Sequence, residues 1–140
     1  MRDDRILHDI LEHNQLTPLF QTIYSLAENR IYGYEALIRG PAESPLHNPT
    51  VLFEDAAKYA RLAEMDQRCS QVCVEAWLRL QFTGKLFLNI NPASMLQPGF
   101  QKGEVRDIIG VAGVVPGQVV MEITEHMPTD DYALLREAVV

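Results

Sequence analysis

The chain alternates between segments with the apolar spacing of helices and short runs with the composition of strands. A short amphipathic helix is expected at residues 3–13, and extended runs at 16–25 and 30–40 suggest a hairpin. The clearest helix carries an apolar stripe that steps by three and one, formed by Cys69, Val72, Cys73, Ala76, Trp77 and Leu80.

Two later segments, LFLNIN (86–91) and QVVMEIT (118–124), are short and mostly apolar, which predicts two buried strands. Further helices are expected after Asn48 and Pro49, across residues 105–112, and from residue 128 onward. This alternation of helix and strand indicates an α/β fold with parallel strands. A small open sheet that is complete as written is the alternative interpretation of the same pattern.

Polar side chains interrupt each of these apolar strands. Within IYGYEALIRG, the two-residue period puts Glu35, Leu37 and Arg39 on one face. Asn89 and Glu122 interrupt the two later strands in the same way. Burying an unpartnered polar group costs roughly 2–7 kcal/mol, and a divalent cation is one partner that would offset this cost. Oxygen donors without a neighbouring His or Cys favour Mg²⁺ or Mn²⁺ over zinc.

Each of these polar residues also has an ordinary structural interpretation. Glu35 and Arg39 would form an ion pair along one strand face. Asn89 would satisfy a bend before Pro92, and Glu122 would cap a neighbouring helix. From the pattern alone, the metal site and these interpretations remain equally open.

Composition and charge narrow the class of protein. The chain has 140 residues, of which 47% are hydrophobic and 22% are charged, as in an ordinary soluble domain. Its net charge of −7 argues against a nucleic-acid polymer as partner. No apolar run approaches the roughly 20 residues of a membrane helix. The charged start MRDDRILHDI lacks the apolar stretch of a signal peptide, so we expect a cytoplasmic location.

Cysteine and histidine add no clear site. Cys69 and Cys73 are spaced to share one helical face, where a metal or redox pair is possible but core packing is the preferred interpretation. The four histidines are scattered without the spacing of metal ligands; they are His8, His13, His47 and His126.

Three segments carry a resemblance to a known family. PLFQTIYSLAENRIYGYEALIRG (18–40) resembles the opening hairpin of the EAL domain, and Glu35-Ala36-Leu37 is the tripeptide that names it. FLNINP resembles the asparagine-bearing strand of that family, and VVMEITE resembles its third signature. The tripeptide alone has little value, whereas the three segments in family order are highly specific.

The resemblance implies a fold and a set of site residues. The fold would be a partial modified TIM-type (β/α) barrel that begins with a hairpin and is truncated before closure. Residues 1–15 would form a leading helix and residues 16–140 the first barrel elements of a single EAL domain. Glu35, Asn89 and Glu122 would be metal ligands, with Glu35 also catalytic, while the substrate contacts would be Gln21, Leu37 and Arg39. Two Mg²⁺ or Mn²⁺ ions would serve the hydrolysis of cyclic-di-GMP to linear pGpG.

Some family features differ or are missing. Asn91 stands where many members have serine, and the loop GPAESPLHNPT differs from the commoner form. The family's paired aspartates, its lysine strand, and its later glutamate and glutamine do not appear by Val140. We therefore expect a truncated chain without activity of its own, and exposed barrel edges that favour self-association. Other signalling domains are expected in the parent protein.

Two other functions remain to be weighed against a metal-dependent phosphodiesterase. A degenerate EAL domain would bind cyclic-di-GMP or a partner protein without hydrolysing the nucleotide. The presence of Glu35, Asn89 and Glu122 favours the enzyme, although the residues that would separate the two lie beyond Val140. A generic α/β protein of unrelated function is the third interpretation.

Overall fold

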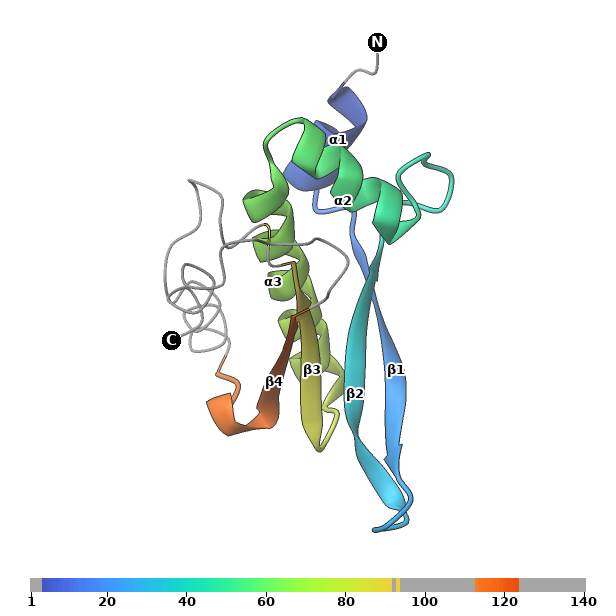
Figure 1. Cartoon of the computed structure of the whole chain (residues 1–140), viewed down its shortest axis with the longest axis vertical. Helices are drawn as coiled ribbons and strands as arrows, with labels where there is room; N and C mark the ends of the chain where they lie inside the picture. The colour runs from blue at the N-terminus through green and yellow to red at the C-terminus, as the bar shows by residue number, and fades with distance from the viewer. Residues whose placement is uncertain (1–3, 92, 94–112, 124–140) are drawn as a thin grey trace.

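The structure is a computed structural model that describes residues 4–91, 93 and 113–123 (Figure 1). A helix and a long hairpin come first, two helices follow, and two short strands complete the described part. The elements are α1 (Arg5–Glu12), β1 (Thr17–Ser25), β2 (Arg30–Arg39), α2 (Pro49–Lys58), α3 (Leu62–Leu80), β3 (Lys85–Ile90), the short 3₁₀ helix η1 (Pro116–Gln118) and β4 (Val119–Ile123).

The four strands form one open sheet in the order β1-β2-β3-β4. β1 and β2 pair antiparallel, which confirms the hairpin, whereas β2, β3 and β4 run parallel. The hairpin is longer than its neighbours and extends past the start of β3 and β4 (Figure 1). Parallel strands need crossover connections, and α2 with α3 forms the one between β2 and β3.

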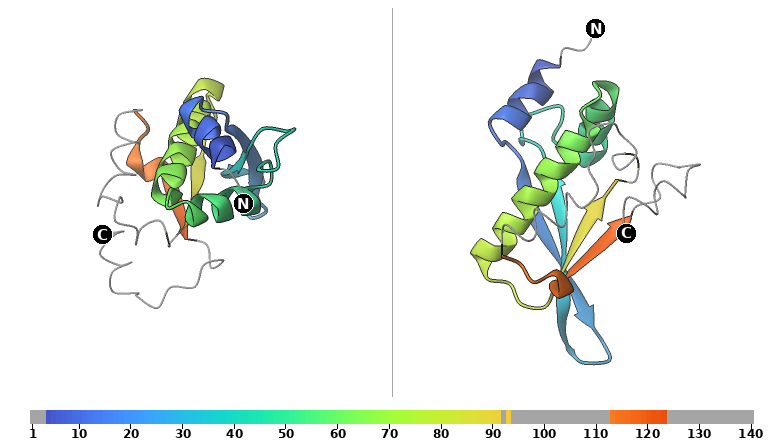
Figure 2. Two further views of the ribbon diagram at one scale, coloured as in Figure 1. Left: turned by 90° about the horizontal axis from the view of Figure 1, so that it is seen from above. Right: turned by 90° about the vertical axis from the view of Figure 1, so that its left-hand side faces the viewer.

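Helix α3 covers one face of the sheet, as the side view in Figure 2 shows. Its buried stripe, which includes Cys73 and Trp77, packs toward the strand residues Ala36, Leu86 and Leu88 in one hydrophobic core. At the far end of α3, an aromatic cluster closes the core. The Tyr34 and Phe82 rings stack with centroids 4.3 Å apart, and Phe20 and Trp77 complete the cluster. The predicted apolar stripe therefore faces the core from Cys69 to Trp77, whereas its last member, Leu80, is 50% exposed.

The two cysteines are free thiols buried within this stripe. Burial raises the pKa of the Cys73 thiol to about 12. Burial also raises the pKa of Cys69, and the charge of Asp66 adds to that effect. Thiols that stay protonated are poor nucleophiles and poor metal ligands, which fits a packing role.

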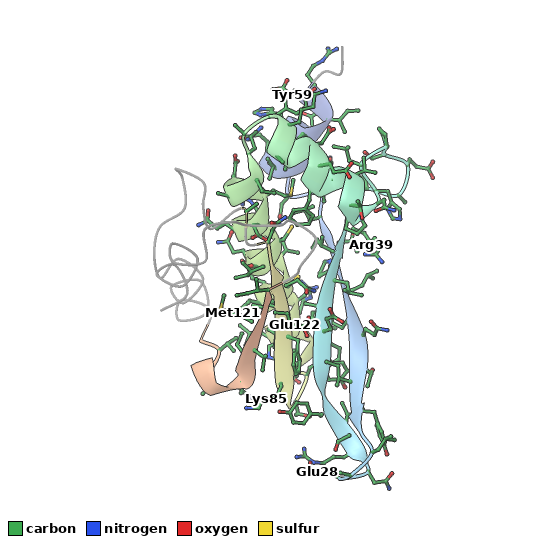
Figure 3. All side chains as sticks on the ribbon, in the orientation of Figure 1. Glu28, Arg39, Tyr59, Lys85, Met121 and Glu122 are labelled. Atoms are coloured by element: carbon green, nitrogen blue, oxygen red, sulfur yellow. The ribbon has the colours of Figure 1, made fainter. Side chains whose placement is uncertain are left out.

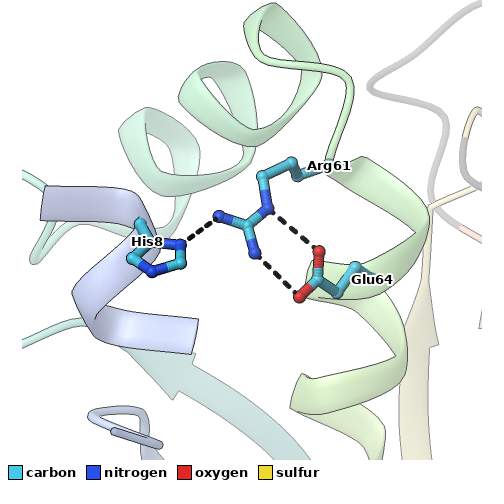
Figure 4. Close-up of polar contacts among 3 residues, drawn as sticks. All are labelled: His8, Arg61 and Glu64. Atoms are coloured by element: carbon cyan, nitrogen blue, oxygen red, sulfur yellow. Dashed lines mark hydrogen bonds and ion pairs between the residues drawn. The ribbon is translucent and has the colours of Figure 1, made fainter. Parts of the chain in front are cut away.

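Helix α1 is fixed to the top of α2 and α3 by buried Leu7, Ile10 and Leu11. A polar contact accompanies this packing (Figure 4). Arg61 donates two hydrogen bonds of 2.9 Å to the Glu64 carboxylate, and its third side-chain nitrogen lies 3.2 Å from His8 Nδ1 on α1. Arginine cannot accept a hydrogen bond, so the His8 nitrogen is the acceptor. Residues more than fifty positions apart thus hold α1 against the start of α3.

Helix ends follow the local sequence. The Asn48 side chain accepts a hydrogen bond of 2.8 Å from the Thr50 amide, so Asn48 and Pro49 start α2 as expected. Helix α3 ends at Gln81, whose φ of 55° lies in the left-handed region. No helix within the described residues has the length and hydropathy needed to cross a membrane.

The helices expected late in the chain stay predictions, and one expected strand meets a different outcome. The expected helices at 105–112 and from 128 onward lie outside the described residues. Segment 118–124 contains a strand, β4, but this strand is only partly buried: Met121 and Ile123 are 38% and 43% exposed. β4 is the edge strand of the described sheet, and α3 packs mainly on β1, β2 and β3 rather than on β4. Apolar composition predicted the strand correctly but not its degree of burial.

Backbones of β2 and β3 approach closely at Gly33. A Cβ at this position would lie 2.3 Å from the Lys85 carbonyl oxygen and 3.0 Å from the Lys85 Cβ. A bulge lies beside it, because Ile23 pairs with Gly33 while Tyr24 pairs with Ile31, which leaves Tyr32 unpaired. The glycine therefore permits the pairing that brings β2 and β3 together.

We expect Gly33→Ala to lower the free energy of unfolding by about 1–3 kcal/mol, because a rigid backbone atom would have to move. Gly117→Ala is the matched control, since its Cβ would meet no described atom within 4 Å. Urea titrations followed by circular dichroism measure both. Equal midpoints for the two variants would contradict the close approach.

Candidate functional site

The sheet face opposite α3 carries the polar residues singled out by the sequence. Glu35 lies on β2, Asn89 on β3 and Glu122 on β4, and all three are half-buried. Asn89 and Glu122 are register partners, while Glu35 pairs with Phe87 two residues earlier on β3. Because the strands are parallel and side chains alternate, the three residues share one face. The structure brings them together toward the carboxyl ends of their strands.

Asn89 links β2 to β3 through its side chain. Its Nδ2 donates hydrogen bonds to Glu35 Oε1 at 3.1 Å and to the Ala36 carbonyl oxygen at 3.3 Å. Both hydrogens of the carboxamide are thereby committed to β2. The carboxamide oxygen remains as an acceptor on the face that carries the two glutamates.

Glu122 shares this face with a second carboxylate. Burial raises the pKa of Glu122, and the charge of Glu35 and a hydrogen bond to Glu35 raise it further. Two carboxyl groups held this close do not both ionise at little cost. The pair therefore retains a proton more readily than an isolated glutamate, or takes a cation in its place.

Arg39 lies near the end of β2, farther along the strand than the glutamate pair (Figure 3). Its Nη1 donates to the Ile38 carbonyl oxygen at 2.8 Å, and no ion pair between Arg39 and Glu35 occurs in the described part of the chain. The ion-pair interpretation of these residues is therefore not supported. A partly buried guanidinium beyond the carboxylates is placed to meet an anionic group.

Gln21 and Leu37 complete the set expected from the sequence. Gln21 lies opposite Glu35 in the β1–β2 ladder, so the two side chains share a face. Leu37 is two residues beyond Glu35 and half-buried. Gln21 is exposed, and its position places an amide beside the glutamate pair rather than within it.

The loop that follows β2 is closed at its neck by a contact the sequence analysis missed. The Gly40 amide donates to the His47 carbonyl oxygen at 3.0 Å, and His47 Nδ1 lies 2.9 Å from the Gly40 carbonyl oxygen. A Cβ at Gly40 would lie 2.2 Å from the Leu46 carbonyl oxygen, so the close approach requires glycine. Buried Leu46 anchors the loop to the core. Glycine directly after Arg39 was the available signal for such a turn.

Asp66 is a second residue that the sequence analysis did not single out. It is 7% exposed on α3, and its Oδ2 accepts a hydrogen bond of 3.1 Å from the Asn91 amide. An acidic residue within the apolar stripe of a core helix was the available signal.

The arrangement is suited to a hard divalent cation. It offers two carboxylates and one carboxamide oxygen, the ligand types that Mg²⁺ prefers. Within residues 4–91, 93 and 113–123, no three His, Cys, Asp or Glu side chains gather in a group that could hold a metal ion, so the described groups alone do not make a complete site. A cation there would offset the repulsion between the two glutamates.

A family model matches nearly the whole chain. The sequence model of the family described as the EAL domain matches residues 4–139. The chain belongs to the EAL domain family. No curated protein matches the EAL chain.

Solved EAL structures share the fold. The FimX EAL domain of Xanthomonas citri, in complex with c-diGMP, is 18% identical with a TM-score of 0.71, over 96% of this chain and 52% of that one. The phosphodiesterase PaMucR in a c-di-GMP complex is 21% identical with a TM-score of 0.72, over 94% and 56%. The FimX EAL domain from Pseudomonas aeruginosa, bound to c-di-GMP, is 29% identical with a TM-score of 0.67, over 95% and 53%. The chain spans about half the length of these structures.

The raised pKa of Glu122 has a consequence for stability in metal-free buffer. The folded protein binds this proton more tightly than the unfolded chain, so stability falls as pH rises from the ordinary glutamate pKa of about 4.3 through the raised value. Glu122→Gln removes this dependence. We expect the urea midpoint of the variant to rise relative to the midpoint of the wild type as pH rises through this window. Below the window, the difference between the two midpoints should vanish.

Glu54→Gln, on the exposed side of α2, is the matched control for this titration. The measurement is a series of urea unfolding curves with EDTA present. They are taken between about pH 3.5 and about pH 7.5, a range that spans the titration of a glutamate carboxyl with a raised pKa. A midpoint difference for Glu122→Gln that is constant across the series would contradict the carboxyl pairing.

Proposed function

We propose that this chain forms part of a metal-dependent phosphodiesterase that hydrolyses cyclic-di-GMP to linear pGpG. The observation that carries the proposal is the convergence of Glu35, Asn89 and Glu122 on one sheet face, where the Asn89 amide donates a hydrogen bond to Glu35 and the charge of Glu35 helps to raise the pKa of Glu122. Membership of the EAL domain family supports it, as do the structural neighbours whose names report bound c-di-GMP. The cation would be Mg²⁺ or Mn²⁺.

The donor set fits a divalent cation for a physical reason. Glu35 and Glu122 repel each other when both are ionised, and a cation between them would remove this repulsion. The side-chain amide of Asn89 donates to Glu35 and to the Ala36 carbonyl oxygen, which leaves its carboxamide oxygen for coordination. A divalent cation supplies an activated water and offsets charge on a phosphoryl oxygen.

The residues of the chain would bind and orient the substrate around that site. Arg39, beyond the glutamates on β2, would hold a phosphate through its guanidinium. Leu37 would lie against the nucleotide, and Gln21 would face the same region from β1. Water would add to the phosphorus of one phosphodiester, and the bond from that phosphorus to the ribose 3′ oxygen would break. The leaving oxygen takes a proton, and the linear product keeps a 5′ phosphate.

A binding protein without hydrolysis is the competing function. A receptor needs the nucleotide contacts but not the cation ligands, and here the two glutamates and the asparagine are all present on one sheet face, with Asn89 hydrogen-bonded to Glu35. That arrangement favours the enzyme. Nucleotide binding that does not depend on Mn²⁺ or on Glu35 would instead identify a receptor.

Replacing one glutamate oxygen is the direct test of the cation site. We expect Glu35→Gln to reduce Mn²⁺ affinity at least about tenfold, because it removes one of the two carboxylate charges while it keeps an oxygen that can accept from Asn89. Titration of the chain with Mn²⁺, followed by the electron paramagnetic resonance signal of the free ion, measures this. Glu54→Gln is the control. Equal affinity in wild type and Glu35→Gln would refute the site.

Residues 1–140 alone should not turn over cyclic-di-GMP, because the described residues offer only two carboxylates and one amide, and the chain spans about half the length of the solved EAL structures. Chromatographic assay for pGpG with Mn²⁺ present tests this, with the PaMucR phosphodiesterase as the positive control. Measurable pGpG formation that Glu35→Gln abolishes would show that residues 1–140 suffice.

A further inference from the structure

A buried carboxylate outside the ligand set lies beside the end of β3. Asp66 is 7% exposed on the first turns of α3, within an otherwise apolar core. Burying a carboxylate is costly unless it is hydrogen-bonded, so the groups that it holds are fixed in place. The groups bonded to Asp66 therefore show which part of the fold this carboxylate holds in place.

One partner of Asp66 is the backbone just after β3. Asp66 Oδ2 accepts a hydrogen bond of 3.1 Å from the amide of Asn91, the first residue beyond the strand. The Asn91 side chain then accepts a hydrogen bond of 2.9 Å from the Ala93 amide, which forms a tight turn. Asp66 thus anchors the start of this turn to α3.

The end of β3 has less backbone support than its start, because its ladder with β2 stops before the strand ends. Pairing between β2 and β3 ends at Ala36 and Leu88, whereas pairing with β4 continues through Asn89 and Ile90. Beyond the last backbone pair of β2 and β3, the Asn89 side chain links the two strands by donating to Glu35 and to the Ala36 carbonyl oxygen. The orientation of the Asn89 carboxamide depends on the position of the β3 backbone.

We propose that Asp66 is a positioning residue for Asn89. Asp66 holds the backbone amide of Asn91, two residues farther along the chain, so that the Asn89 carboxamide keeps its hydrogen bonds to Glu35 and to the Ala36 carbonyl oxygen on β2. The effect on the cation rests on the proposed function above, whereas the effect on the Asn89 geometry does not. Outer partners that orient a ligand typically change metal affinity about 10–100-fold when removed.

The test compares acceptor and charge at position 66. Asp66→Ala removes the acceptor, whereas Asp66→Asn keeps one oxygen that the Asn91 amide can reach, while it loses the charge and exchanges the other oxygen for an NH2 group. Asp55→Ala is the matched control, because Asp55 is 4% exposed on α2 and so loses an equally buried carboxylate elsewhere. If Asp66→Ala does not fold, Asp66→Ser, whose hydroxyl is too short to reach Asn91, takes its place.

Two readouts are taken on the folded variants. The first is the pair of Asn89 side-chain amide resonances in a metal-free ¹⁵N correlation spectrum. We expect these to shift in Asp66→Ala and to stay near the wild-type position in Asp66→Asn and Asp55→Ala. The second is Mn²⁺ affinity, which we expect to fall about 10–100-fold in Asp66→Ala and to recover in Asp66→Asn.

The two readouts separate the possible failures. Unchanged Asn89 resonances in the acceptor-free variant would overturn the positioning role, as would an equal change in Asp55→Ala. A wild-type chain that binds no Mn²⁺ would overturn the cation site of the proposed function, while the resonances would still decide the role of Asp66.

Discussion

The three parallel strands β2, β3 and β4 carry their carboxyl ends to one edge of the sheet, and the position of each candidate ligand depends on that pairing. Two glutamates and an asparagine, distant in sequence, are forced onto one face where their charges and dipoles interact. The close approach at Gly33 sets the spacing of β2 and β3. The chemistry of the site is therefore a consequence of backbone pairing rather than of any local motif.

The opposite face of the sheet makes that polar face tolerable. Helix α3 and the aromatic cluster bury the apolar side of the same strands, and this burial supplies the main stabilisation. A sheet anchored on one side can carry half-buried carboxylates on the other without unfolding. The electrostatic cost of the glutamate pair is the kind of local strain that is found at functional sites.

Local features were predictable from the sequence, and long-range contacts were not. The stripe and the Asn48 cap depend on neighbouring residues, and both are found as expected, except that the stripe is buried only from Cys69 to Trp77. Alternation along each strand also predicted that Glu35, Asn89 and Glu122 interrupt apolar strands. The two-residue offset between Glu35 and Asn89 depends on register, which a single sequence does not reveal. The contacts of His47 with Gly40 and of Asp66 with Asn91 depend on how loop and helix return to the strands.

The buried thiols described above have a practical consequence. Because Cys69 and Cys73 are shielded within the core and stay protonated near neutral pH, maleimide reagents should leave them untouched while the fold is intact. A single cysteine introduced on the outer surface would then be the sole point of attachment for a fluorophore or spin label. The chain can thus be labelled for distance measurements while Cys69 and Cys73 are both retained.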